Sequence, residues 1–410
     1  MALIKVSRPL LRELARVIPE RPFALEFWDG GRLAATEPDS PTFYVRAPSA
    51  LAHALRAPGP FGLGRAYVEG SLDCDDLDKA FIVVDDWIPP PIANKDKARL
   101  LAALALAAAP AGIPRRPNSE LILKGERHSP GRDKEAVRYH YDVGNEFFAL
   151  FLDESMTYSC AVFSAGPGRP RRAKTLAEAQ RTKLDLIAKK LELKPGQRLL
   201  DVGCGWGSFA MHAAREYGVT VTGITLSTRQ AELAQQRVKD AGLTDKVEIR
   251  IADYRELADE PFDAISSIGM AEHVGIEQID TYAQALHRVL KPGGLVLNHA
   301  ISLMRPEEDP TVDKFTMRYV FPDGHPLLLS RTQLAFERAR FYTEHVEGFM
   351  KDYADTLRCW HDNLDEHLEE AERLAGIERL RIWRLYLRAA RHGFDVGYTA
   401  VYQLKARKPL

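Results

Sequence analysis

The chain has 410 residues, of which 45% are hydrophobic and 28% are charged, a length and composition that suit two or three globular domains. Its formal net charge is −1, which argues against the basic surface that binds nucleic acid. The four cysteines are widely scattered and form no CxxC or other metal-ligand spacing. They indicate reduced thiols in a cytoplasmic protein rather than a disulfide framework or a metal site.

The N-terminal residues lack the apolar run and cleavage site of a signal peptide, so we expect no export. The most apolar stretch, residues 100–113, contains Pro110 and is too short to span a bilayer. Any membrane contact is therefore expected to be peripheral.

Residues 1–90 predict a small α+β domain. Residues 23–35 read as a hairpin with a Gly-Gly turn, and residues 41–47 read as another strand. Residues 72–87 predict a helix with an acidic start.

Residues 91–125 predict a linker, because prolines bound a single Ala/Leu-rich helix. Two interpretations of this helix stay open, packing against one of the domains or contact with a membrane. The second rests on basic residues that flank its apolar core, namely Lys95, Lys97, Arg99, Arg115 and Arg116.

Residues 126–410 predict one large domain in which strands and helices alternate from about residue 175. Such alternation is typical of a mostly parallel, Rossmann-like sheet with crossover helices, here expected to have seven strands. A cap is expected at 130–175 and a helical lid or insertion at about 305–390. The last strand, residues 396–407, is expected to return to the edge of the sheet.

A glycine-rich turn follows the first strand of this domain and marks a cofactor site. In LDVGCGWG, Gly203 and Gly205 let the backbone approach a ligand, and Asp201 ends the strand where it can receive a ligand amine. A purely structural turn is the alternative. The next strand ends in Thr225, Leu226 and Ser227 with Gln230 nearby, instead of the acid that a dinucleotide site needs, so NAD is disfavoured. The pattern is typical of a class I S-adenosylmethionine methyltransferase, in which residues 253–254 would flank the adenine.

Seven short motifs occur in the order found in cyclopropane fatty acid synthases, and the resemblance covers about residues 130–400. They are HYDVGNEFF, TYSCAVF, LDVGCGWGS, ITLS, SIGMAEHVG, HAIS and YADTLRCW. The resemblance implies methyl transfer from S-adenosylmethionine to the double bond of an unsaturated acyl chain in a membrane phospholipid. It also implies peripheral association with the inner face of the membrane and a homodimer.

The resemblance also assigns site residues, and no metal is expected among them. A bound bicarbonate ion would remove the proton and would be held by Cys160, Glu272, His299, Ile301 and Tyr353. The cap would fold back over the cofactor. The residues implied at the cofactor are Tyr141, Tyr158, Ser159, Gly203, Gly205, Thr225, Leu226, Ser227, Gln230, Tyr254, Ile268 and Gly269, to which the strand ends add Asp201 and Asp253.

The product is a separate question, because the cation formed by methylation can close a cyclopropane ring or lose a methyl proton after a hydride shift. The chain looks most like the actinobacterial branch that makes tuberculostearic acid through a 10-methylene intermediate, which a flavin-dependent reductase partner then saturates. Glu146 stands where many cyclopropane synthases have aspartate, and we hypothesise that it helps to direct proton removal. The alternatives are a solvent-facing Glu146 and a cyclopropane product.

Two rival classes remain at this stage. One is a methyltransferase for a small molecule or a protein, and the other is a non-catalytic module that binds lipid or cofactor. The basic cluster at 168–174 is expected either to meet anionic lipid headgroups or to form a solvated loop.

Overall fold

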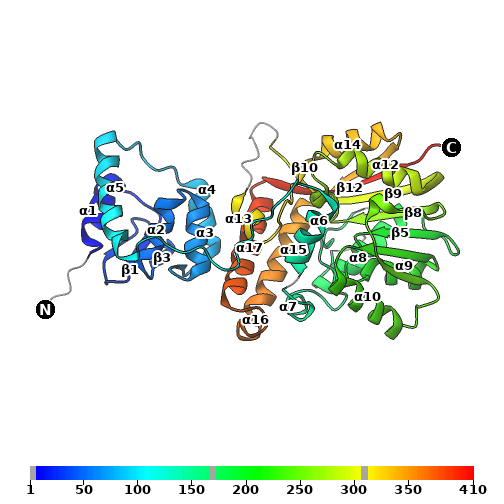
Figure 1. The fold of residues 1–410 in the computed structure, drawn as a ribbon, viewed down its shortest axis with the longest axis horizontal. Helices are drawn as coiled ribbons and strands as arrows, with labels where there is room; N and C mark the ends of the chain where they lie inside the picture. Colours follow the sequence, from blue (N-terminus) through cyan, green and yellow to red (C-terminus); the bar gives the residue numbers. More distant parts are fainter. Residues whose placement is uncertain (1–5, 142, 167–171, 306–312) are drawn as a thin grey trace. The chain divides into compact units, whose positions relative to one another are not determined.

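The computed structural model describes residues 6–141, 143–166, 172–305 and 313–410 (Figure 1). The basic cluster at 168–174 and the beginning of the expected lid therefore lie partly outside the described residues. The chain forms two compact units, neither of which is continuous in sequence. The first comprises residues up to 121 together with 313–319 and 376–392, and the second comprises the rest.

The first unit contains a four-stranded sheet in the order β2-β1-β3-β4, covered by short helices. The predicted hairpin is present, since β1 and β2 pair antiparallel through a turn in which Gly30 has a φ of +73°. The region predicted as one helix at 72–87 begins instead with strand β4. The elements are α1 (Arg8–Val17), β1 (Ala24–Phe27), β2 (Arg32–Leu33), β3 (Thr42–Val45), α2 (Pro48–Arg56), α3 (Pro60–Glu69), β4 (Leu72–Cys74), α4 (Leu77–Asp86) and α5 (Asn94–Ala108), followed by the short η1 (Ala109–Ala111).

Helix α5, which was expected within a linker, packs against α1 and α2 through Ala103 and Ala107. Its Leu101 and Leu106 side chains are exposed. Helix α13 (Lys314–Tyr319) and most of α17 (Ile377–Asp395), which lie in the segment expected to be a lid, also belong to this unit.

The second unit is built on an eight-stranded sheet in the order β11-β12-β9-β8-β5-β6-β7, with β10 beside β9 (Figure 1). Strands β5 to β9 run parallel, and β12 is antiparallel to both of its neighbours. The strands are β5 (Arg198–Val202), β6 (Thr220–Thr225), β7 (Val247–Ile251), β8 (Phe262–Ile268), β9 (Leu290–Leu303), β10 (Leu327–Leu328), β11 (Tyr342–Gly348) and β12 (Thr399–Arg407).

The mostly parallel, Rossmann-like sheet is thus confirmed, with two differences from the expectation. Seven strands form the continuous path of the sheet, as expected, and the two-residue strand β10 adds an eighth beside β9. The last strand, β12, inserts between β9 and β11 instead of forming the edge. The edge strand β11 and strand β10 both come from the segment that was expected to be a helical lid.

Helices cover both faces of this sheet, so its strands are apolar on both sides. Along β5, for example, Leu199 belongs to the core under α8 to α10, whereas Leu200 belongs to the core under α12 and α14. The helices of this unit are α6 (Pro130–Tyr141), α7 (Asn145–Ala149), α8 (Leu176–Lys190), α9 (Ser208–Tyr217), α10 (Thr228–Asp240), η2 (Tyr254–Glu256), α11 (Ala271–Val274), α12 (Ile279–Val289), α14 (Leu329–Arg338), α15 (Met350–Asp365) and α16 (Leu368–Ala375). None of the helices in the described residues is long and apolar enough to cross a membrane.

Candidate functional site

A pocket, called here the central pocket, opens at the carboxyl ends of β5, β6, β7 and β8, where open α/β sheets bind ligands. All the predicted cofactor residues except Ser227 line it. They are Tyr141, Tyr158, Ser159, Asp201, Gly203, Gly205, Thr225, Leu226, Gln230, Asp253, Tyr254, Ile268 and Gly269.

The glycine turn joins β5 to α9 in a conformation that only glycine adopts readily. Gly203 and Gly205 have φ values of +75° and +56°, so a side chain at either position would be strained. The Trp206 indole in the same turn donates a hydrogen bond of 2.8 Å to Asn145 Oδ1 on α7. The turn is therefore held against the cap as well as against the sheet.

At the end of β5, Asp201 is buried and accepts a hydrogen bond of 2.7 Å from the Ser266 hydroxyl. Burial raises the pKa of its carboxyl to about 6. On α8, burial lowers the pKa of the Lys183 ammonium to about 8. The central pocket therefore has a carboxylate and an ammonium in its wall, both largely withdrawn from water.

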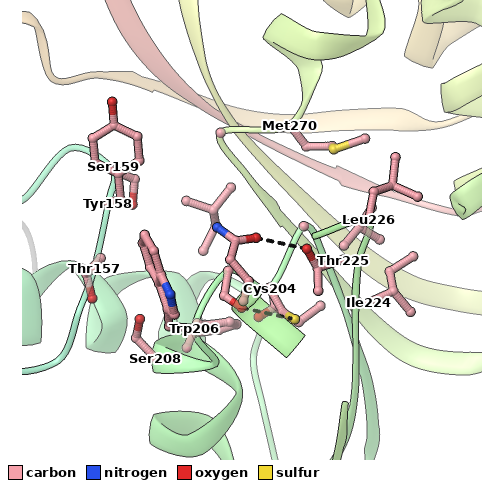
Figure 2. Close-up of a pocket in the computed structure, with 18 of the residues that line it drawn as sticks. Thr157, Tyr158, Ser159, Cys204, Trp206, Ser208, Ile224, Thr225, Leu226 and Met270 are labelled. Carbon is pink, nitrogen blue, oxygen red and sulfur yellow. Dashed lines mark hydrogen bonds between the residues drawn. The ribbon is translucent and has the colours of Figure 1, made fainter. Parts of the chain in front are cut away.

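At the end of β6, the Thr225 hydroxyl donates a hydrogen bond of 2.9 Å to Gln230 Oε1, as Figure 2 shows. Ser227 caps α10 by accepting a hydrogen bond of 3.3 Å from the Gln230 backbone N–H. The side chains of Thr225 and Gln230 thus hold each other in place at the pocket.

At the end of β7, Asp253 is paired with the neighbouring Arg255 through its Nε and Nη2 atoms, at 2.9 and 2.5 Å. Tyr254 is buried with its ring edge-on to Tyr282. The Asp253 carboxylate is thus already engaged, whereas the ring of Tyr254 contributes an apolar wall to the pocket.

The cap residues Thr157, Tyr158 and Ser159 form the opposite wall of the pocket from Leu226 and Ile224 (Figure 2). Gln180 on α8 is fully buried and donates hydrogen bonds to the carbonyls of Thr157 (3.2 Å) and Ser159 (2.9 Å). Lys183, one turn further along, donates a hydrogen bond of 2.8 Å to the Ser159 hydroxyl. Helix α8 therefore positions this loop through two buried polar side chains.

A second group of predicted residues gathers around Phe349, which precedes α15. The Cys160 thiol lies 3.8 Å from the Phe349 carbonyl, and the His299 ring stacks on the Phe349 ring with centroids 6.5 Å apart. The Tyr353 backbone N–H donates a hydrogen bond of 3.0 Å to the Phe349 carbonyl. The fold thus brings Cys160, His299 and Tyr353 to one place; we call these residues and Phe349 the Phe349 cluster.

Glu272, at the start of α11, reaches the same strand as His299. Its Oε1 accepts a hydrogen bond of 2.6 Å from the Ile301 backbone N–H. Its Oε2 is shielded from solvent and has no hydrogen-bond partner among the described residues. Burial raises the pKa of the carboxyl to about 7, so the proton is held weakly near neutral pH.

The tautomer of His299 follows from its neighbours on β12 and α8. Lys190 Nζ donates to Gln403 Oε1 at 2.6 Å, which turns the Gln403 amide nitrogen toward His299 Nδ1, 3.2 Å away. Nδ1 must therefore accept, and the proton sits on Nε2. This Nε2–H is buried and has no partner among the described residues, and burial lowers the pKa of the ring well below its usual value. His299 is thus a neutral donor.

The comparisons with known proteins agree with one another. The family model described as mycolic acid cyclopropane synthetase matches residues 128–404. A probable fatty acid methyltransferase of Pseudomonas putida is 37% identical, over 95% of this chain and 92% of its own. The chain belongs to the mycolic acid cyclopropane synthetase family. It is an S-adenosylmethionine-dependent methyltransferase.

Other members of the family differ in their named products. Tuberculostearic acid methyltransferase UfaA1 of Mycobacterium tuberculosis is 32% identical, over 97% of this chain and 90% of its own. The cyclopropane-fatty-acyl-phospholipid synthase of Escherichia coli is 36% identical, over 74% and 72%. Among solved structures, mycolic acid cyclopropane synthase CmaA1 with SAH and CTAB has a TM-score of 0.63 and 35% identity, covering 67% of this chain and 98% of that one.

One predicted catalytic residue of this family member is exposed to solvent. Glu146 lies on α7 with an exposed side chain and does not line the central pocket. This position agrees with the solvent-facing alternative for Glu146.

The sequence analysis missed several residues of the pocket. Lys183, Trp206, Met270 and His273 all line it, and Gln180 holds the cap loop beside it. A signal for two of them was available, because Gln180 and Lys183 fall on the apolar face of the helix at 175–193, between Ala179 and Leu184. A polar residue on an apolar helix face needs a buried partner or a ligand.

Proposed function

We propose that this enzyme methylates the double bond of an oleoyl-type acyl chain in a membrane phospholipid and gives a 10-methylene chain, the precursor of 10-methyl (tuberculostearic) acid. The substrate class is supported by the synthase of E. coli, which is named for fatty acyl phospholipid. The product is supported by UfaA1, whose similarity extends over nearly the whole of both chains, whereas the E. coli enzyme matches about three quarters of this one.

S-adenosylmethionine supplies an electrophilic methyl group, and the central pocket is the place for it. Gly203 and Gly205 allow close approach of the backbone, and Asp201 suits the amine of the methionine moiety. Thr225 and Gln230 offer polar groups where other Rossmann-like sites bind ribose. Tyr254 with Ile268 provides apolar surface for adenine, and Tyr141, Tyr158 and Ser159 close the pocket from the cap.

The protein must stabilise a cation on the acyl chain and keep water away from it, because the alkene needs no activation by a base. An aromatic cluster that includes Tyr158 of the pocket wall would meet both requirements. The Tyr158 ring lies 5.1 Å from Trp360 and 5.3 Å from Phe148, and Tyr353 lies 6.0 Å from Trp360. Aromatic faces attract cations, and buried rings exclude water.

Bicarbonate as the proton acceptor fits the residues present, and the unpartnered buried atoms are the observation that carries this part of the proposal. His299 Nε2–H is a donor for an anion, and Glu272 Oε2 can accept the proton of a bicarbonate hydroxyl. Cys160 and Tyr353 from the Phe349 cluster, with the backbone of Ile301, would complete the set. Bound bicarbonate would supply a base that takes a proton from the methylated chain.

A cyclopropane product is the second candidate, and the E. coli synthase and CmaA1 favour it. Both products need the same methyl transfer and differ only in which proton leaves and whether a ring closes. The sites described here are compatible with both.

The same proposal places the enzyme in the cytoplasm at the inner face of the membrane, as a homodimer, with a flavin-dependent reductase that saturates its product. Support for the membrane contact comes from the lipid substrate and from exposed Leu101 and Leu106 on α5, a helix flanked by basic residues.

The test is to incubate purified protein with S-adenosylmethionine and dioleoyl phospholipid vesicles and to analyse the fatty acids by mass spectrometry and proton NMR. A gain of one CH2 with vinylidene protons is the expected result. Upfield cyclopropyl protons would replace the methylene proposal by the second candidate, and the absence of product would contradict both. Glu146→Gln is the matched control and is expected to leave rate and product unchanged.

A further inference from the structure

Helix α8 carries a lysine in the interior of the second unit. Lys183 is 1% exposed and follows Gln180 on the buried face of the helix. Burying an ammonium without a counter-ion is costly, so such a residue is retained where a partner or ligand compensates the charge.

The partners of Lys183 leave most of its hydrogen-bonding capacity unused. An ammonium has three N–H donors, and Nζ makes one hydrogen bond in the described part of the chain, to the neutral Ser159 hydroxyl at 2.8 Å. No carboxylate oxygen of the described residues lies within ion-pairing distance of Nζ. The Cys160 thiol and the carboxyls of Asp153 and Asp201 act on it at longer range, and Asp201 is itself bonded to Ser266.

Both Lys183 and Asp201 line the central pocket, beside the glycine turn. They offer one positive and one negative group in a wall shielded from water, which matches the two charges of an α-amino acid. We propose that Lys183 binds the carboxylate of the methionine moiety of S-adenosylmethionine, while Asp201 faces its amine. This inference rests on the proposed position of the cofactor.

Bicarbonate is the other anion that the same chemistry would attract. The methionine carboxylate is favoured because Lys183 bonds Ser159, a residue of the pocket wall, whereas Cys160 and His299 do not line the pocket. The Lys183 charge also acts on Cys160 and His299, so the experiment has to separate the two anions.

The experiment measures by calorimetry how wild type and Lys183→Met bind two ligands. One is S-adenosylhomocysteine, and the other is its decarboxylated analogue, which keeps the amine. The variant is expected to bind S-adenosylhomocysteine about 10- to 100-fold more weakly, the range for one charge-assisted hydrogen bond, and to bind the analogue as wild type does. Lys189→Met, on the exposed face of the same helix, is the matched control. Thermal melting reports folding, and Lys183→Gln replaces the methionine variant if that one does not fold.

An equal loss for both nucleosides would overturn the proposal and make Lys183 a support of the loop alone. Unchanged affinity for both would also overturn it, and a raised bicarbonate requirement of the same variant would then identify bicarbonate as the anion. Binding needs no lipid turnover, so a wrong lipid substrate or product leaves this result intact. Failure of the wild type to bind S-adenosylhomocysteine would overturn this proposal and the proposed function together.

Discussion

The buried carboxyl of Glu272 makes the folding stability of the protein depend on pH. Its carboxyl is held by one backbone N–H and is otherwise buried, which raises its pKa to about 7 from an ordinary value near 4.5. Below about pH 4.5 the group is protonated in both the folded and the unfolded chain. Above that pH the unfolded chain ionises first, so stability is lost between about pH 4.5 and 7 and stays lost above pH 7.

Glu272→Gln is therefore expected to stabilise the protein at pH 8 by up to about 3 kcal/mol and to have almost no effect at pH 4.5. The amide keeps an oxygen for the Ile301 N–H but cannot ionise. Urea unfolding at the two pH values measures the difference, and methyl transfer is expected to fall by about 100-fold or more. Equal stabilisation at both pH values would contradict the assigned pKa shift.

Gln403 offers a direct test of the His299 tautomer. Gln403→Glu places a carboxylate beside Nδ1, which would then carry the proton, so Nε2 would become an acceptor and repel an anion. We expect methyl transfer at limiting bicarbonate to fall by about 100-fold, with the fold retained. Nitrogen NMR of histidine-labelled protein reads the tautomer directly, and Gln403→Met separates loss of the donor from inversion. An unaltered tautomer together with unaltered bicarbonate dependence would show that the hydrogen bonds from Lys190 through Gln403 do not set the His299 tautomer.

Helix α8 packs against the sheet and also holds the cap loop by hydrogen bonds. Leu184 and Ile187 pack in the core, whereas Gln180 and Lys183 hold residues 157–159. One helix thus couples the wall of the central pocket to the packing of the sheet.

Gln180→Leu is expected to leave the carbonyls of Thr157 and Ser159 without donors, at a cost of about 1–3 kcal/mol each. The loop should then exchange its amide hydrogens faster, and affinity for S-adenosylhomocysteine should fall. Hydrogen exchange of residues 153–163 measures the first effect and calorimetry the second. Gln236→Leu, on the exposed face of α10, is the control. Unchanged exchange in the loop would show that other contacts hold it.

Helices and strands that show a clear local sequence pattern were predictable. The position of a strand in the sheet, which depends on the strands it pairs with, was not. Apolar runs and a glycine turn indicated β5, α9 and β6 directly. Strand β12 was predicted as a strand, but its place in the sheet depends on which strands it pairs with. Strand β11 is polar and half exposed, so it lacks the apolar pattern that predicts a strand. The site followed the same division: Gly203 and Gly205 were readable from local spacing, whereas Lys183 contradicts the rule that lysine lies at the surface.

At the scale of the whole molecule, the chain consists of two units with separate cores. The sequence predicted a domain at 1–90, a linker at 91–125 and a second domain from residue 126, whereas the first segment of the first unit runs to residue 121. It did not indicate that residues 313–319 and 376–392 return to that unit. Their helical, charged pattern contains nothing that specifies which core they join.

This interleaving determines the order in which the protein can be completed during synthesis. The ribosome delivers most of the first unit at the start, but Phe315 and Trp383, which are buried in it, emerge only after strands β5 to β9. The unit that begins first thus remains unfinished until residue 392 has left the exit tunnel. A nascent chain must protect its early apolar surface for nearly the whole of translation.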